Sequence, residues 1–176
     1  MSGLKPPVGA HDHAKGSDTA SVTLVEYGDY ECPHCAVVHP IVKAVQRHFG
    51  HRLRFVFRNF PLTQVHPHAD HAAEAAEAAD PAGKYWDMHD AIFEHQTAIT
   101  DRDLARYGEQ VGLEPGVIED ALTAQTYAAR VRADFMSGVR SGVNGTPMFF
   151  INGEQYQGGY DAASLIAGIE ETAARG

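Results

Sequence analysis

The sequence predicts an α/β fold in which helices cover a central mixed sheet. A β-branched run at residues 22–27 is followed by apolar residues at helical spacing after Pro33 and by an alternating apolar pattern over residues 53–60. These patterns form a strand–helix–strand unit, whose crossover is nearly always right-handed. Strand patterns return only at residues 148–156, as a hairpin that precedes a last helix. The predicted order is therefore βαβ, a long helical block, and ββα.

The predicted elements end at residues that suit turns and caps. The first strand stops at Gly28, and Gly50 stands where a glycine commonly closes a helix. The pair Asn152-Gly153 favours a tight turn between the strands of the hairpin. Asp161 can cap the last helix by accepting hydrogen bonds from its first turn.

The block between the second strand and the hairpin is predicted to be helical. It is alanine-rich at residues 67–79, and Thr100 with Asp103 resembles a capping box at the start of a later helix. Two apolar stripes mark further helices: Trp86 with His89 and Phe93, and Tyr127 with Val131, Phe135 and Val139. We interpret the first stripe as packing between helices and not as chemistry.

The 176-residue length favours one compact scaffold with an insertion over two enzymatic domains. Residues 1–20 contain prolines, glycines and polar clusters and are expected to be a flexible lead-in. We expect residues 21–62 and 143–176 to form the α/β core and residues 63–142 to form a helical insertion. The site should lie where the first strand meets its helix, because α/β sheets place their sites at the carboxyl ends of strands.

Charge and hydropathy exclude several classes of partner. The chain carries 14 basic and 23 acidic side chains, a net charge of −9, which repels nucleic acid and anionic membrane surfaces. No run approaches the roughly 18 apolar residues of a membrane-spanning helix. Residues 1–20 lack the continuous apolar stretch of a signal peptide, so a cytoplasmic protein is expected, with a trimmed exported precursor as the alternative. We expect neither nucleic acid nor a membrane among its partners.

The only two cysteines stand in the motif Cys32-Pro33-His34-Cys35, directly after the first predicted strand. Such a pair does not make a disulfide framework that stabilises a fold, so it is either redox-active or metal-binding. Its position at a strand-to-helix junction favours redox chemistry. A thiolate at a helix N-terminus is stabilised by unsatisfied backbone N–H groups and by the helix dipole.

This position predicts a distinct role for each residue of the motif. Cys32 is expected to be the exposed nucleophile, and Cys35, one turn into the helix, the buried resolving thiol. Pro33 suits the first helical position because its φ angle fits and its missing N–H would have no partner there. His34 adds a hydrogen-bond donor or a positive charge near the sulfur. A stabilised thiolate is a good leaving group, so the Cys32–Cys35 disulfide should be oxidising.

A metal site is the main alternative for these cysteines. A lone C-x-x-C sequence can supply half of a zinc site, and the chain has 11 histidines. His66, His68 and His71 lie close together in the sequence and are a second candidate for metal binding, although histidines entering an alanine-rich helix are more often just solvated. Further zinc ligands would have to come from distant segments, which favours the redox interpretation.

Three sequence features together resemble the DsbA family of thioredoxin-fold disulfide oxidoreductases. They are Glu26, the motif at residues 32–35, and the distant Gly145-Thr146-Pro147. The resemblance covers residues 21–176 and implies a thioredoxin-like fold whose core is interrupted by the helical insertion. It also implies a protein disulfide oxidoreductase that needs no metal or organic cofactor beyond the redox-active disulfide of the motif.

The same resemblance implies roles for residues outside the motif. Pro147 should be a cis-proline that faces Cys32, and Thr146 should offer backbone groups to an extended substrate that binds by strand addition. Glu26, six residues before Cys32, should be a buried acid that relays protons to Cys35. Its apolar surroundings would raise its pKa. The alternative for Glu26 is a carboxylate on an edge strand that reaches solvent.

The sequence therefore predicts a thiol–disulfide exchange enzyme whose substrates are protein thiols and disulfides. Its redox partner would be a thioredoxin-like reductase or glutathione. In a reducing cytoplasm, a reductase, isomerase or stress-response role is as plausible as an oxidase role. Two alternatives stay open: a member of the fold linked to glutathione or another small thiol, and a metal-binding interaction module that uses Cys32 and Cys35 as ligands.

Overall fold

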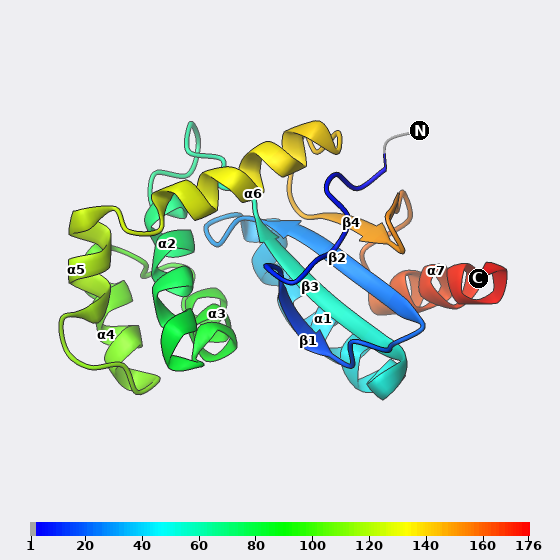
Figure 1. The fold of residues 1–176 in the computed structure, drawn as a ribbon, viewed down its shortest axis with the longest axis horizontal. Helices are drawn as coiled ribbons and strands as arrows, with labels where there is room; N and C mark the ends of the chain where they lie inside the picture. The colour runs from blue at the N-terminus through cyan, green and yellow to red at the C-terminus, as the bar shows by residue number, and fades with distance from the viewer. Residues whose placement is uncertain (1–2) are drawn as a thin grey trace. The chain divides into compact units, whose positions relative to one another are not determined.

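The computed structural model describes residues 3–176 and confirms the predicted α/β fold (Figure 1). Five strands form one sheet in the order β1-β3-β2-β4-β5. The strand β4 is antiparallel to both β2 and β5, and β1 is antiparallel to β3. The strands are β1 (His13–Gly16), β2 (Val22–Gly28), β3 (Leu53–Asn59), β4 (Met148–Ile151) and β5 (Glu154–Gln155).

Seven α-helices and two short 3-10 helices complete the described part of the chain. They are α1 (Pro33–Phe49), η1 (Gly50–Arg52), α2 (Ala69–Ala79), η2 (Asp80–Ala82), α3 (Tyr85–Glu94), α4 (Asp101–Gln110), α5 (Val117–Ala124), α6 (Ala128–Arg140) and α7 (Ala162–Arg175). The capping box of Thr100 and Asp103 on α4 and the Asp161 cap of α7 are both confirmed. No helix within residues 3–176 is long and apolar enough to cross a membrane.

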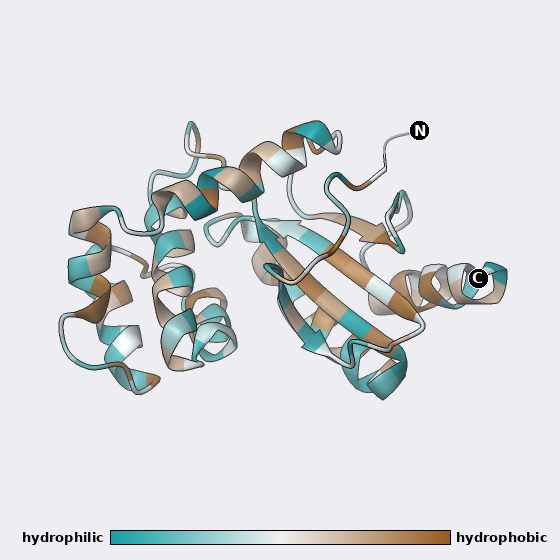
Figure 2. Ribbon diagram, in the orientation of Figure 1, coloured by the Kyte–Doolittle hydropathy of each residue, from teal (hydrophilic) through white to brown (hydrophobic). Residues whose placement is uncertain are grey.

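The two central strands are almost completely buried. Figure 2 colours most of the middle of β2 and β3 as hydrophobic. Leu24, Val25 and Tyr27 of β2 are at most 1% exposed, as is typical of a strand covered on both faces. A Cβ atom at Gly28, the last residue of β2, would lie 2.5 Å from the ring of Phe57 in β3. Glycine at this position therefore lets the two strands pack closely.

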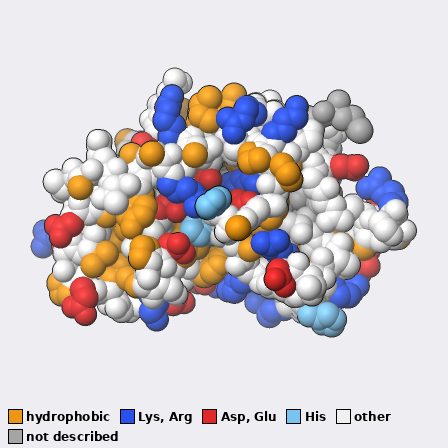
Figure 3. Space-filling model, in the orientation of Figure 1, with side chains coloured by type: hydrophobic (Ala, Val, Ile, Leu, Met, Phe, Trp, Pro, Cys, Tyr) orange, Lys and Arg blue, Asp and Glu red, His pale blue; other side chains and the backbone are white. Residues whose placement is uncertain are grey.

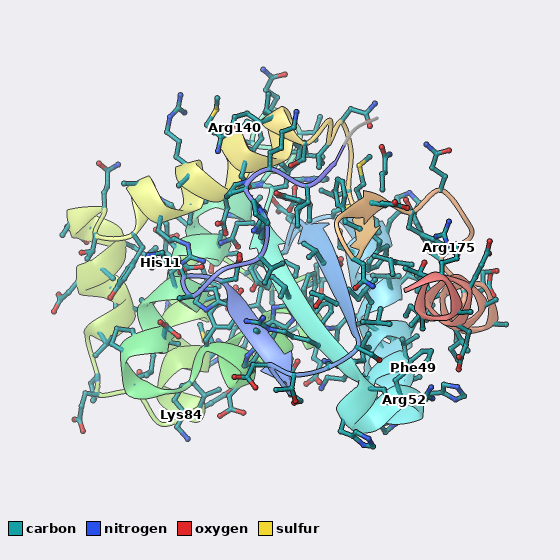
Figure 4. The ribbon with its side chains drawn as sticks, turned by 45° about the vertical axis from the view of Figure 1, so that its right-hand side comes forward. His11, Phe49, Arg52, Lys84, Arg140 and Arg175 are labelled. Atoms are coloured by element: carbon teal, nitrogen blue, oxygen red, sulfur yellow. The ribbon has the colours of Figure 1, made fainter. Side chains whose placement is uncertain are left out.

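The predicted turns adopt the left-handed backbone that their sequences favour. Gly50 closes α1 with a φ of 55°, and Arg52 then lies over the ring of Phe49, 5.0 Å from its centroid (Figure 4). Asn152 and Gly153 join β4 to β5 with φ values of 49° and 85°. Two successive positive φ angles are the signature of the hairpin turn predicted for this pair.

The chain divides into two compact units. The first contains the sheet and consists of the chain up to Gly28, Val37–Arg58 and Met136–Gly176, and the second consists of Asp29–Ala36 and Asn59–Phe135. The predicted boundaries, with a core at residues 21–62 and 143–176 and an insertion at residues 63–142, need one important correction. The segment that carries both cysteines groups with the helical unit, because side-chain hydrogen bonds within that unit fix it.

The N-terminal segment is ordered, so the flexible lead-in predicted for residues 1–20 is wrong for the part that the structure describes. Strand β1 pairs with β3, where His13 lies opposite Phe57. Further upstream Leu4 is buried, and its N–H donates to the carbonyl oxygen of Gly153 at 2.9 Å. A four-residue strand with polar side chains has no clear alternation, which explains why the sequence did not indicate it. Residues 1 and 2 lie outside the described residues.

Arg58 is a buried cation that holds this N-terminal segment in place. Many charged side chains lie on the surface, where Figure 3 shows acidic and basic groups interspersed, but the Arg58 side chain is 3% exposed. Its guanidinium donates to the carboxylate of Asp12 at 2.8 and 2.9 Å, to the carbonyl oxygens of Pro6 and Pro7, and to the hydroxyl of Tyr27. Burial alone would lower the pKa of Arg58, but the hydrogen bonds with Asp12 and Tyr27 outweigh burial and raise it.

Replacing Asp12 with asparagine should destabilise the first unit by about 3 kcal/mol, because Arg58 would keep its buried charge without the main counter-charge. Urea unfolding followed by circular dichroism measures this change. The matched control is Asp18→Asn, since Asp18 is exposed in the same N-terminal segment. Equal unfolding midpoints for the two variants would contradict the anchoring role of Arg58.

The buried face of α6 differs from the predicted apolar stripe. Val131 is buried, but Val139 is 48% exposed. A four-residue repeat drifts about 40° per step around a helix of 3.6 residues per turn, so Tyr127 and Val139 do not share one face. The buried face instead includes Asp134, whose carboxylate accepts the backbone N–H of Asn59 at 3.0 Å. Hydrogen bonding thus replaces part of the predicted apolar contact.

In the helical unit, α2 carries a histidine and a buried glutamate whose charges interact. His71 Nδ1 lies 2.7 Å from a carboxylate oxygen of Asp101, and this hydrogen bond raises the pKa of His71. Glu74 is 4% exposed, and its Oε1 atom has no hydrogen-bond partner among the described residues. Burial raises the pKa of the Glu74 carboxyl group, and the charge of His71 offsets part of that increase.

The raised pKa values of His71 and Glu74 should both make the helical unit less stable as the pH rises. The His71–Asp101 pair contributes fully below the ordinary histidine pKa of 6.5, and its contribution is lost as the pH rises through the raised folded-state value. Glu74 must ionise in a buried position once the pH rises from 4.5 through its raised folded-state pKa.

We expect Glu74→Gln to melt at a higher temperature than wild type at about pH 8 but not at about pH 4. The control Glu109→Gln changes an exposed carboxylate, and an equal effect there would contradict this explanation.

Candidate active site

The motif lies where a short loop, Asp29–Cys32, leads into helix α1. The carbonyl oxygen of Cys32 accepts the N–H of Ala36 at 3.2 Å, the first i to i+4 hydrogen bond of the helix, so Cys32 occupies the N-cap position. Pro33 is the first helical residue, as predicted. Pro33 and His34 are both exposed. The sulfur of Cys32 therefore belongs to a residue at the positive end of the α1 dipole.

The two cysteines differ less in burial than predicted. Cys35 is fully buried as expected, but Cys32 is only 5% exposed, so the expectation of an exposed nucleophile is wrong. The two residues are not joined by a disulfide in this structure. The loop that carries Cys32 is tied into the helical unit by hydrogen bonds.

Asp29 anchors the start of this loop. Its carboxylate is buried, and its two oxygens accept the backbone N–H of Glu31 at 2.8 Å and that of Leu62 at 2.9 Å. His66 Nδ1 lies 2.7 Å from the same oxygen that accepts from Leu62. The carbonyl oxygen of Asp29 also accepts the N–H of Cys32 at 3.1 Å. One carboxylate thus connects the motif loop to the segment after β3.

Tyr30 fixes the middle of the loop by packing among the helices. Its hydroxyl lies 2.8 Å from His89 Nδ1 and 3.3 Å from the Tyr85 hydroxyl, and its ring lies 4.7 Å from that of Phe93. The Trp86 and His89 rings are 5.0 Å apart, so the predicted packing role of this stripe is confirmed. Burial raises the pKa of Tyr85 well above its ordinary value, which keeps its hydroxyl neutral.

Gln96 completes the set of loop contacts. Its side-chain amide donates to the carbonyl oxygen of Tyr30 at 2.9 Å and to that of Cys32 at 2.7 Å. The sequence analysis missed Asp29, Tyr30 and Gln96. Asp29 and Tyr30 stand just before the motif in the sequence, and this position is the only signal that could have indicated them. Gln96 is separated from Cys32 by 64 positions in the sequence, and no local pattern points to it.

The three neighbouring histidines do not form a common site. His66 pairs with Asp29, and His71 pairs with Asp101 on α4. The backbone N–H of His68, rather than its ring, donates to Glu31 at 2.8 Å. Within residues 3–176, neither these histidines nor the two cysteines belong to a cluster of three or more possible metal ligands.

Glu26 is a buried residue of a central strand. It is 3% exposed and lies opposite Phe149 in the pairing of β2 with β4. Because β2 has a neighbour on each side, the alternative of an edge-strand carboxylate that reaches solvent is wrong. The predicted burial of this acid is therefore confirmed, whereas its proton-relay role stays a prediction.

Pro147 and Thr146 precede strand β4 in the first unit. Tyr27 lies opposite Met148, so the next position of β4 toward its start, Pro147, comes at the C-terminal end of β2. The Thr146–Pro147 peptide bond is cis, Pro147 is buried and Thr146 is partly exposed. The structure thus brings Pro147 to the strand end from which the chain continues to the motif loop. Glu26 and Pro147 belong to the first unit and both cysteines to the second.

Comparison with known proteins identifies the family. The profile described as thioredoxin matches residues 10–171, which is nearly the whole chain. The chain belongs to the thioredoxin family. The crystal structure of oxidised BdbD from Bacillus subtilis is similar with a TM-score of 0.84 and 25% identity, covering 93% of each chain. A thioredoxin-like oxidoreductase from Silicibacter pomeroyi DSS-3 gives a TM-score of 0.81 and 25% identity, covering 94% of this chain and 93% of that one.

A third structure shares the fold. The thiol-disulfide exchange protein alpha-DsbA2 from Wolbachia pipientis has the same fold, with a TM-score of 0.76 and 20% identity over 93% of this chain and 86% of that one. The thioredoxin-like fold and the resemblance to DsbA-type oxidoreductases, both predicted from the sequence, are confirmed.

Several curated relatives of this thioredoxin-family chain are named as antiporters. They include the Na(+)/H(+) antiporters NhaA 1 of Salinispora arenicola and NhaA 3 of Salinispora tropica, each 40% identical over 158 residues. These matches cover 90% of this chain but 24% of each antiporter. The chain thus spans about a quarter of the length of these relatives.

The N-cap position of Cys32 predicts that the pKa of its thiol lies well below the ordinary cysteine pKa near 8.5. Titration of thiolate absorbance in the ultraviolet measures this midpoint, and a value for Cys32 at or above about 8 would remove the argument for an activated nucleophile. The variant His34→Ala should raise the midpoint and make the disulfide less oxidising, because one stabiliser of the thiolate is lost. An unchanged midpoint and potential would mean that His34 has no part in activation.

Proposed function

We propose that this chain is a protein thiol–disulfide oxidoreductase of the DsbA type that works through Cys32 and Cys35. The observation that carries the proposal is the N-cap position of Cys32, with Cys35 in the first turn of the same helix, in a member of the thioredoxin family. Backbone N–H groups and the helix dipole lower the pKa of a thiol at that position. The exposed neighbours Pro33 and His34 leave this end of α1 open to a substrate.

The exchange reaction proceeds in two balanced steps. The Cys32 thiolate attacks one sulfur of a substrate disulfide, forms a mixed disulfide and releases the other substrate sulfur as a thiolate. Cys35 then loses its proton and attacks the Cys32 sulfur, which closes the Cys32–Cys35 disulfide and releases the second substrate thiolate. Two electrons pass to the substrate, and the reverse sequence oxidises a substrate dithiol. No metal or organic cofactor takes part.

Other residues are proposed to support these steps. Glu26 is the buried acid that would accept the proton of Cys35, and the loop at Thr146 and Pro147 would offer main-chain groups to a substrate strand. Main-chain hydrogen bonds do not depend on the side chains of the substrate, which suits an enzyme with many protein substrates. A thioredoxin-like reductase or glutathione would restore the starting redox state.

The two cysteines should behave differently when each is replaced. In Cys35→Ala, Cys32 can still attack a substrate disulfide, but no internal thiol releases the mixed disulfide, so the complex should accumulate. In Cys32→Ala no complex should form. Non-reducing gels of each variant incubated with a disulfide-bonded protein reveal the trapped species. Equal trapping by both variants, or by neither, would contradict the mechanism.

The same variants separate the alternatives for the cysteine pair. A zinc site predicts that both replacements weaken metal binding to a similar degree and that neither traps a substrate. A glutathione-linked enzyme predicts that Cys35→Ala accumulates a mixed disulfide with glutathione in preference to one with a protein. Mass spectrometry of the trapped species distinguishes a glutathione adduct from a protein adduct.

The antiporter relatives favour a partner for the proposed exchange activity. This chain matches about a quarter of each antiporter, which suggests that a thioredoxin-family unit can belong to the same protein as a Na(+)/H(+) exchanger. We propose that a sodium–proton antiporter is a redox client of this chain, a membrane-protein partner that departs from the expectation drawn from its net charge. Trapping by Cys35→Ala in membranes that contain such an antiporter with cysteines would support this client. Its absence from the trapped species would contradict the client while leaving the exchange mechanism unaffected.

A further inference from the structure

We infer that Gln96 is a positioning residue for Cys32, an inference that rests on the proposed exchange function. The side-chain amide has two N–H donors, and both are used on the motif loop. One donates to Tyr30 at 2.9 Å and the other to Cys32 at 2.7 Å, each time to the carbonyl oxygen. A single side chain thus holds the peptide group that joins Tyr30 to Glu31 and the one that joins Cys32 to Pro33.

The bond to the Cys32 carbonyl acts at the point where α1 begins. That oxygen also accepts the N–H groups of Cys35 at 3.1 Å and Ala36 at 3.2 Å. A third donor from outside the helix fixes the plane of this peptide group. An N-cap side chain receives hydrogen bonds from the first-turn N–H groups only when its backbone has the required orientation. By fixing that orientation, Gln96 keeps the Cys32 sulfur where the first turn can stabilise a thiolate.

The same two bonds also act on the electrostatic environment of the sulfur. The carbonyl oxygens of Tyr30 and Cys32 carry partial negative charges on the loop that bears the nucleophile, and negative charge disfavours a thiolate. The N–H groups of the Gln96 amide place partial positive charges against both oxygens. Loss of these donors should therefore raise the pKa of Cys32 even if the loop keeps its shape.

Gln96 is itself held firmly in the segment after α3. The neighbouring His95 caps α3, since its Nδ1 atom lies 2.9 Å from the carbonyl oxygen of Ala91, and its ring stacks on Tyr107 with centroids 5.1 Å apart. On the other side, the Tyr107 hydroxyl donates to the carbonyl oxygen of Ala98 at 2.6 Å. These contacts restrain the chain on both sides of Gln96. Less conformational entropy is therefore lost when its amide binds the loop.

The loop should stay folded without Gln96, because other contacts anchor it. Asp29 binds Leu62 and His66, and the Tyr30 hydroxyl binds His89. Removing the amide donors should therefore change the chemistry of Cys32 more than the stability of the helical unit. This difference separates a positioning residue from one that only supports the fold.

The test uses Gln96→Met, which keeps the length of the side chain and removes both donors. We expect the ultraviolet titration midpoint of Cys32 to rise toward the ordinary value near 8.5. Below that midpoint, the thiolate fraction and the rate of mixed-disulfide formation should fall about fivefold, the effect of one typical hydrogen bond. The matched control is Gln110→Met, which makes the same change on the exposed end of α4 and should leave both quantities unchanged.

A second variant guards against a loss of folding. Gln96→Glu is nearly isosteric with glutamine, and its carboxylate adds negative charge beside Cys32, so the midpoint should rise further than in Gln96→Met. An unchanged midpoint in either variant, with near-ultraviolet circular dichroism like that of wild type, would overturn the inference. Loss of folding in both variants would also overturn it, because Gln96 would then be a structural residue. A wild-type midpoint near 8.5 would instead contradict the proposed exchange function itself.

Discussion

The buried carboxylate of Asp29 is the interaction on which the geometry of the site depends. A carboxylate that is 1% exposed is tolerated only if hydrogen bonds replace its lost hydration. Asp29 obtains them from Glu31 within the loop and from Leu62 and His66 beyond strand β3. The loop that presents Cys32 is therefore shaped by residues of the helical unit. The position of the Cys32 loop thus depends on residues that follow strand β3.

The sequence predicted those features that depend on local chemistry. Pro33 at the first position of α1, the left-handed turn at Asn152 and the cap at Asp161 all follow from the residue itself and its neighbours. The features that it did not predict depend on distant partners. The segment before strand β1 is held in place by Arg58, and the Cys32 loop by Gln96, and neither pairing leaves a periodic signal in the sequence. The candidate site was thus found by its motif, but its supports were not.

Specific polar pairs explain most of the other differences between expectation and structure. An apolar stripe was expected along α6, yet Asp134 is buried in the middle of this helix, where its carboxylate accepts the backbone N–H of Asn59. Histidines that are close in sequence looked like possible metal ligands, yet His66 and His71 each satisfy a different carboxylate. Hydrophobic patterning predicts where a helix forms, whereas such specific pairs decide which of its faces is buried.

The close approach at Gly28 has a consequence for sequence variation in the family. A Cβ atom there would lie 2.5 Å from the Phe57 ring and 3.3 Å from a carboxylate oxygen of Glu26, so every other amino acid would have to displace one of them. Exposed His34 meets no comparable obstacle, although it stands inside the motif. In a saturation library or among diverging homologues, position 28 should be the more invariant of the two. Steric exclusion at a strand end can thus constrain a sequence position more tightly than a place between the two cysteines.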